Sequence, residues 1–123
     1  KELDIELMES YEDNNLIMFL VNNFKDNVPI EINKLIMNVK QNNEKESLRV
    51  AHKLKNLFLN VGSHQSAELC QEIEDNYKTI NKDTVENLEH LLYYEYKSTQ
   101  KTLNHYLDSR TWWKIDTLQE QFD

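Results

Sequence analysis

The single glycine and the single proline of this chain constrain its fold more than any other feature. Tight hairpin turns between β-strands usually need glycine, often as an Asn-Gly or Asp-Gly pair, and neither pair occurs in these 123 residues. A fold built on hairpins is therefore disfavoured. The sequence predicts an all-α protein before any periodicity is counted, and its length suits one domain with one hydrophobic core.

Apolar residues recur at helical spacing in four long segments that polar stretches separate. The four stripes are Ile17, Leu20, Val21, Phe24, Val28, Ile32, Leu35 and Val39; Ala51, Leu54, Phe58 and Val61; Ala67, Cys70, Ile73, Tyr77 and Ile80; and Val85, Leu88, Leu92, Tyr96, Thr99, Leu103 and Tyr106. Four amphipathic helices with short connections form an antiparallel bundle. We predict an antiparallel four-helix bundle over residues 1–107, with a short extra N-terminal helix before Asp13.

Three residues are expected to shape the helix ends. Pro29 falls inside the first stripe and should bend or break that helix. Gly62 follows the second stripe, where the residue after a helix often adopts a left-handed conformation. Ser63 can then cap the next helix.

The C-terminal tail, residues 108–123, is considered separately from the bundle because it is rich in large apolar side chains. Its large apolar side chains are Trp112, Trp113, Ile115, Leu118 and Phe122. They could pack on the bundle or on a partner. We favour a helical tail packed on the bundle, because paired tryptophans are uncommon in solvated segments.

Charge and cysteine content narrow the partners and the compartment. The formal net charge of -8 argues against binding nucleic acid or an anionic membrane directly. One cysteine precludes an internal disulfide and fits the reducing cytoplasm. No apolar run could span a bilayer and no signal peptide opens the chain. Because the chain starts at Lys1, it fits a domain of a larger membrane-bound sensor as well as a separate protein.

His52 lies on the exposed face of the second predicted helix. A turn of about 100° per residue places it roughly 150° from the apolar stripe of that helix. Lys55 and Asn56 flank it, while Leu48 lies one turn before and Leu59 two turns after. These leucines suggest a small docking patch. Exposed leucines and surface histidines are also common without any function, so periodicity alone leaves both interpretations open.

The segment that begins at His52 resembles the histidine-containing phosphotransfer (HPt) domain family. In that family the histidine is followed by Leu and Lys two and three residues on, glycines four and ten residues on, often Cys after eighteen, and an acidic or amide residue after twenty-two. The corresponding residues here are His52, Leu54, Lys55, Asn56, Gly62, Cys70 and Glu74. Only Asn56 departs, in place of the first glycine. The likeness extends from about Leu3 to Leu107.

The resemblance implies a role for each of these residues. His52 would be the phosphoacceptor of a phosphorelay carrier, Lys55 would neutralise phosphoryl charge, and Glu74 would hydrogen-bond the imidazole. The residues expected to contact a partner are Leu48, Asn56, Leu59 and Lys78, the last one turn beyond Glu74. Gly62 and Cys70 would be structural.

The chain is expected to be a carrier rather than an enzyme. One glycine cannot form a Gly-rich phosphate loop, and no carboxylate cluster for Mg²⁺ is evident. We therefore expect no cofactor on this chain. The resemblance implies response-regulator receiver domains and a hybrid histidine kinase as partners, with the Mg²⁺ and the phosphorylated aspartate on the receiver.

The residues around His52 also bear on three other interpretations. A dimerising histidine-kinase helix pair would place an acidic residue directly after the histidine, whereas Lys53 stands there. A helical adaptor that binds receivers without phosphotransfer stays open because of Asn56. A metal site from His52, His64 and Cys70 lacks the short paired spacings of zinc sites. The remaining histidines, His64, His90 and His105, are expected at the surface.

Overall fold

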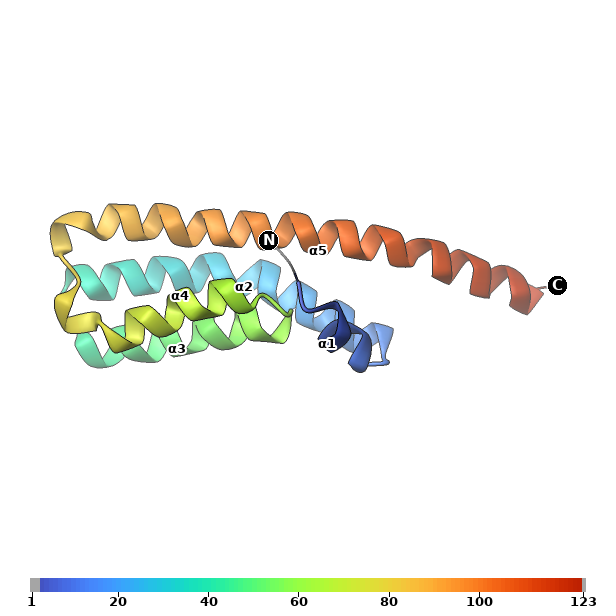
Figure 1. Cartoon of the computed structure of the whole chain (residues 1–123), viewed down its shortest axis with the longest axis horizontal. Coiled ribbons are helices and arrows are strands. Elements are labelled where there is room, and N and C mark those ends of the chain that lie inside the picture. The colour runs from blue at the N-terminus through green and yellow to red at the C-terminus, as the bar shows by residue number, and fades with distance from the viewer. Residues whose placement is uncertain (1–2, 123) are drawn as a thin grey trace.

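The computed structural model describes residues 3–122, without the side chains of residue 82 and of residues 111–122. Its helices are α1 (Ile5–Ser10), α2 (Asn14–Lys40), α3 (Glu44–Asn60), α4 (His64–Asp75) and α5 (Val85–Phe122). Two 3-10 turns, Tyr77–Thr79 and Lys82–Thr84, connect α4 to α5. Figure 1 shows the four longer helices side by side, with α1 near the start of α2. The predicted all-α four-helix bundle with a short N-terminal helix is confirmed.

The core lies between the four long helices and is formed by the predicted apolar stripes. Most stripe residues are buried, and those that remain half-buried are Leu20, Tyr77, Ile80, Leu88 and Tyr96. The rings of Phe24 and Phe58 pack edge-to-face with 5.4 Å between their centroids, and Phe24 stacks on Tyr96 at 5.5 Å. This aromatic cluster joins α2, α3 and α5.

Helix α2 continues through Pro29, so of the two predicted outcomes, a bend or a break, the break does not occur. Proline has no amide N–H, and the carbonyl of Lys25, one turn earlier, therefore loses its helical donor. The hydroxyl of Tyr96 on α5 donates to that carbonyl at 2.9 Å. A contact between helices thus replaces the missing hydrogen bond within α2.

The turn from α3 to α4 depends on Gly62, which has a φ of 77°. The Gly62 N–H donates to the carbonyl of Leu59, and the Ser63 N–H donates to that of Phe58, which closes α3 in a Schellman motif. The Gly62 carbonyl accepts from the Asp4 N–H at 2.8 Å. A Cβ on Gly62 would lie 2.9 Å from the Asp4 nitrogen. Glycine is therefore required by the backbone conformation and by the close approach of the N-terminal segment.

Ser63 occupies the N-cap position of α4, but the predicted capping hydrogen bond is absent. Its hydroxyl instead donates to Ser66 Oγ at 2.9 Å and lies 3.0 Å from Thr99 Oγ1. Ser66 Oγ in turn donates to Glu95 Oε2 at 2.8 Å. These buried polar groups satisfy one another, and the network fixes α4 to α5.

The proposed boundary between residues 107 and 108 lies inside α5, which is one continuous helix. Arg110 pairs with Glu9 of α1 at 2.8 Å, so α5 stays tied to the N-terminal helix beyond that point. The C-terminal part of α5 extends past the other helices (Figure 1). The side chains of Trp112, Trp113, Ile115, Leu118 and Phe122 lie outside the described residues, and their packing stays a prediction. In the part of the chain that the structure describes, no helix has the length and apolar content needed to cross a membrane.

Candidate functional site

His52 projects from α3 with 59% of its side chain exposed. Its Nδ1 lies 3.1 Å from Oε1 of Glu74 on α4, whose side chain is 17% exposed. An ionised carboxylate can only accept hydrogen bonds, so Nδ1 carries the proton in this contact. In the neutral imidazole, the other ring nitrogen, Nε2, then keeps its lone pair. The arrangement leaves an exposed imidazole in a defined tautomer.

Lys55 lies beside this pair and is engaged by two residues of α4. Its Nζ donates to Gln71 Oε1 at 2.8 Å and lies 3.7 Å from Glu74 Oε2. Gln71 also donates through Nε2 to Asp75 Oδ1 at 2.9 Å. Only 19% of the Lys55 side chain is exposed, so the ammonium is held close to the histidine rather than free in solvent.

Gln71 was not foreseen from the sequence. It lies three residues before Glu74, and residues at this spacing share one face of a helix. Because Glu74 was already expected to face α3, that spacing is the signal that could have identified Gln71 as a second contact with the histidine-bearing helix.

The residues expected to contact a partner do not all lie where the sequence suggested. Asn56 is exposed beside His52, and Leu48 is half-buried. Leu59 is half-buried and packs against the hydrophobic core, which the helical projection did not predict, and its contact with a partner stays a prediction. Lys78 is exposed in the 3-10 turn after α4. Because α4 ends at Asp75, Lys78 does not extend the face that carries Glu74.

The side chain of Lys53 contacts α2, whereas that of its neighbour His52 contacts α4. Its Nζ donates to Oε1 of Glu31 at 2.9 Å, and Lys34 lies 3.6 Å from the same oxygen. The Glu31 side chain is only 2% exposed, and its Oε2 has no hydrogen-bond partner among the described residues. A buried carboxylate therefore holds Lys53, and no local sequence pattern indicates this contact.

The cysteine and the other three histidines lie where the sequence predicted, Cys70 in the core and the histidines at the surface. Cys70 is buried, and this burial raises the pKa of its thiol to about 12, as suits a core residue. His64 is exposed, with Nε2 2.8 Å from Asp4 Oδ2, and this hydrogen bond lowers the pKa of the Asp4 carboxyl. His90 and His105 are also exposed. Among the described residues, no group of three or more His, Cys, Asp or Glu side chains could hold a metal ion.

Comparison with known proteins identifies the family. The family model of the Hpt domain matches residues 20–106, which is more than half of the chain and includes His52, Lys55 and Glu74. Searches of curated proteins and of solved structures found no match. The resemblance seen in the sequence is thereby confirmed: this chain belongs to the Hpt domain family, whose members carry phosphoryl groups on a histidine in phosphorelays.

Proposed function

We propose that His52 accepts a phosphoryl group from the aspartate of a receiver domain and passes it to the aspartate of another receiver. The observation that carries this proposal is the exposed imidazole whose Nδ1 is held by Glu74. A nucleophile that serves a large partner must be accessible, and its attacking nitrogen must keep its lone pair. The proposed site of action is the cytoplasm.

In the proposed step, the Nε2 lone pair of His52 attacks the phosphorus atom of the aspartyl phosphate. A nitrogen–phosphorus bond forms, the bond from phosphorus to the aspartyl oxygen breaks, and the aspartate leaves as a carboxylate. The ring gains positive charge as the new bond forms. The Glu74 carboxylate at Nδ1 stabilises this charge from a position that exists before the reaction. Transfer to the next receiver is the reverse sequence.

Lys55 contacts the same Glu74 carboxylate as His52, which places its ammonium beside this chemistry. A phosphoryl group in transfer carries negative charge on its oxygens, which an ammonium nearby neutralises. Gln71 and Glu74 hold Lys55 in place, so little ordering is needed when the partner docks. The proposed partners are receiver domains, which would bring the Mg²⁺, with a hybrid histidine kinase upstream.

A transfer assay with two receiver domains tests this function. The first receiver is phosphorylated with a small-molecule phosphodonor and mixed with the chain, and the second receiver is then added. A carrier becomes labelled with an acid-labile, base-stable phosphate and then loses the label to the second receiver. Binding of both receivers without any label on the chain would contradict the proposal and favour the adaptor that does not transfer.

A further inference from the structure

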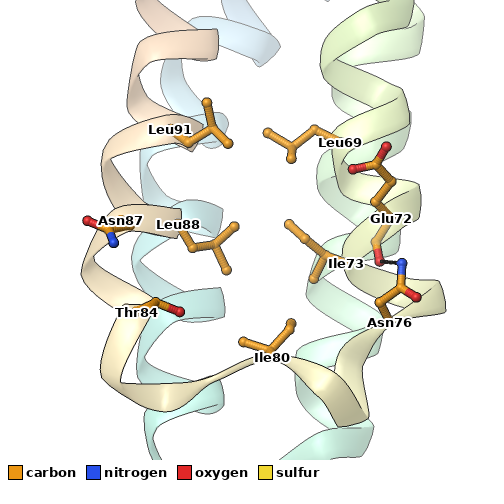
Figure 2. Close-up of a pocket in the computed structure, with 9 residues that line it drawn as sticks. All are labelled: Leu69, Glu72, Ile73, Asn76, Ile80, Thr84, Asn87, Leu88 and Leu91. Carbon is orange, nitrogen blue, oxygen red and sulfur yellow. Dashed lines mark hydrogen bonds between the residues drawn. The ribbon is translucent and has the colours of Figure 1, made fainter.

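An apolar groove of about 360 Å³ lies between α4 and α5. Figure 2 shows Leu69 and Ile73 of α4 pointing toward Leu88 and Leu91 of α5, with Ile80 near one end. Leu91 is 44% exposed, so part of the apolar lining is open to solvent. An apolar surface of this kind with polar residues along its rim is typical of a binding site.

The groove and the phosphotransfer site use different sides of α4. Glu74 contacts His52 and Lys55 of α3, whereas Leu69 and Ile73 line the space facing α5. An occupant of the groove therefore leaves the imidazole of His52 accessible. Phosphotransfer at His52 therefore does not account for the groove.

The charge on the rim indicates which occupant fits. Glu72 lines the groove and is exposed, and no residue that the structure describes forms an ion pair with its carboxylate. The amide of Asn76 donates to the main-chain carbonyl of Glu72, not to the carboxylate. Among the side chains that the structure describes, none of those lining the groove is a Lys or Arg. A cationic side chain on the occupant would thus complement Glu72.

Charge also disfavours two alternative occupants. A second copy of this chain would bring another net charge of -8 toward the first, and an anionic lipid surface would be repelled in the same way. A partner strand has no place to pair, since the groove walls at Leu69 and Leu91 are α-helical and their main-chain groups are used within the helices. A helix that lays an apolar stripe between α4 and α5 meets neither obstacle.

We propose that the α4–α5 groove binds an amphipathic helix of another protein, with apolar side chains against Leu69, Ile73, Leu88 and Leu91 and a Lys or Arg against Glu72. Such helices are recognised through apolar residues spaced by three, four and seven positions. This surface would tether the carrier to a partner while a receiver domain occupies the His52 site.

Selection from a display library of helical peptides tests the proposal on the full chain. Every peptide carries one apolar stripe, and its flanks carry either Lys and Arg or Asp and Glu. We expect basic peptides to be enriched and to shift the amide NMR signals of Leu69, Leu88 and Leu91. Leu91→Glu should weaken their affinity by about tenfold or more. Phe19→Glu, which changes an exposed apolar residue on α2, is the matched control and should leave affinity unchanged.

Reversing the charge of Glu72 provides a second test of the proposal that does not depend on Leu91. Glu72→Lys changes an exposed residue, and it should shift the preference from basic to acidic peptides. Enrichment of no basic peptide, or equal binding to Leu91→Glu, would overturn the proposal. Self-association of the chain that Leu91→Glu abolishes would overturn it in favour of a second copy. If Leu91→Glu loses its helical circular dichroism, the peptide preference of Glu72→Lys decides.

Discussion

The carboxylate of Glu74 lies 3.1 Å from Nδ1 of His52, across the contact between α4 and α3. Its second oxygen lies 3.7 Å from Nζ of Lys55. One side chain therefore links the proposed phosphoacceptor to the cation that would neutralise the incoming phosphoryl group. The charge on Glu74, not only its hydrogen-bonding capacity, is predicted to matter for transfer.

Substituting Glu74 separates these two contributions. Glu74→Gln keeps an oxygen that can accept from Nδ1 but removes the charge, whereas Glu74→Ala removes both. We expect Glu74→Ala to slow phosphotransfer by about tenfold, equivalent to about 1.4 kcal/mol, because His52 is largely solvated. Glu74→Gln should fall between this variant and the unchanged chain in single-turnover assays. Glu72→Gln is the control on the other side of α4, and equal rates for all four proteins would show that Glu74 has no part in transfer.

Substitution of Lys55 and of Gln71 tests the role of the ammonium beside His52. Lys55→Ala should slow transfer or shorten the lifetime of the phosphohistidine, because it removes the ammonium that shares Glu74 with His52. Gln71→Ala should have a weaker effect of the same sign, since it releases Lys55 without removing its charge. Rates and label lifetimes are compared with those of Lys97→Ala, an exposed lysine on α5. Unchanged kinetics in Lys55→Ala would reduce this lysine to a structural role.

Asn56 is the one departure from the family pattern, and it is exposed beside His52. Its side chain lies about 40° around the helix from the histidine, one turn on, where the family glycine leaves the surface bare. We expect Asn56→Gly to speed transfer from a conventional receiver because the approach is less obstructed. The same change should lower the free energy of unfolding by less than about 1 kcal/mol. Slower transfer with every receiver tested would instead mean that the amide assists the chemistry.

Gly62 is predicted to be the least replaceable turn residue. Alanine at its φ of 77° adds conformational strain of about 1–2 kcal/mol, and the new Cβ would meet the Asp4 backbone. Gly62→Ala should therefore lower the free energy of unfolding by about 2 kcal/mol or more in urea titration. Gln65→Ala, at an exposed position in the first turn of α4, serves as the control. Equal stability of the two variants would contradict the account of this turn.

The features that sequence could predict are those that local periodicity determines. The stripe through Ala51, Leu54 and Phe58 fixed the phase of α3, and the structure buries all three. The same phase placed His52 in solvent, where it lies. The position of Gly62 after the stripe likewise indicated a left-handed turn residue, because helix ends have a local sequence signature.

The features that sequence could not predict depend on which helix lies opposite. Pro29 leaves α2 unbroken because Tyr96, distant in sequence, supplies the missing donor to the main chain. The contact of Lys53 with Glu31 likewise requires knowing which face of α2 meets α3. A single-helix projection also does not show that Leu59 packs against the hydrophobic core. Tertiary packing decides each of these, and it leaves no local pattern.

The most direct test of the central claim is to locate the phosphate by NMR on chain labelled with ¹⁵N and phosphorylated by a receiver. We expect phosphorus–nitrogen coupling to Nε2 of His52, because Glu74 occupies Nδ1. The signal should vanish in His52→Gln and persist in His64→Gln, which alters another exposed histidine. A phosphate on any other residue, or on Nδ1 of His52, would contradict the account.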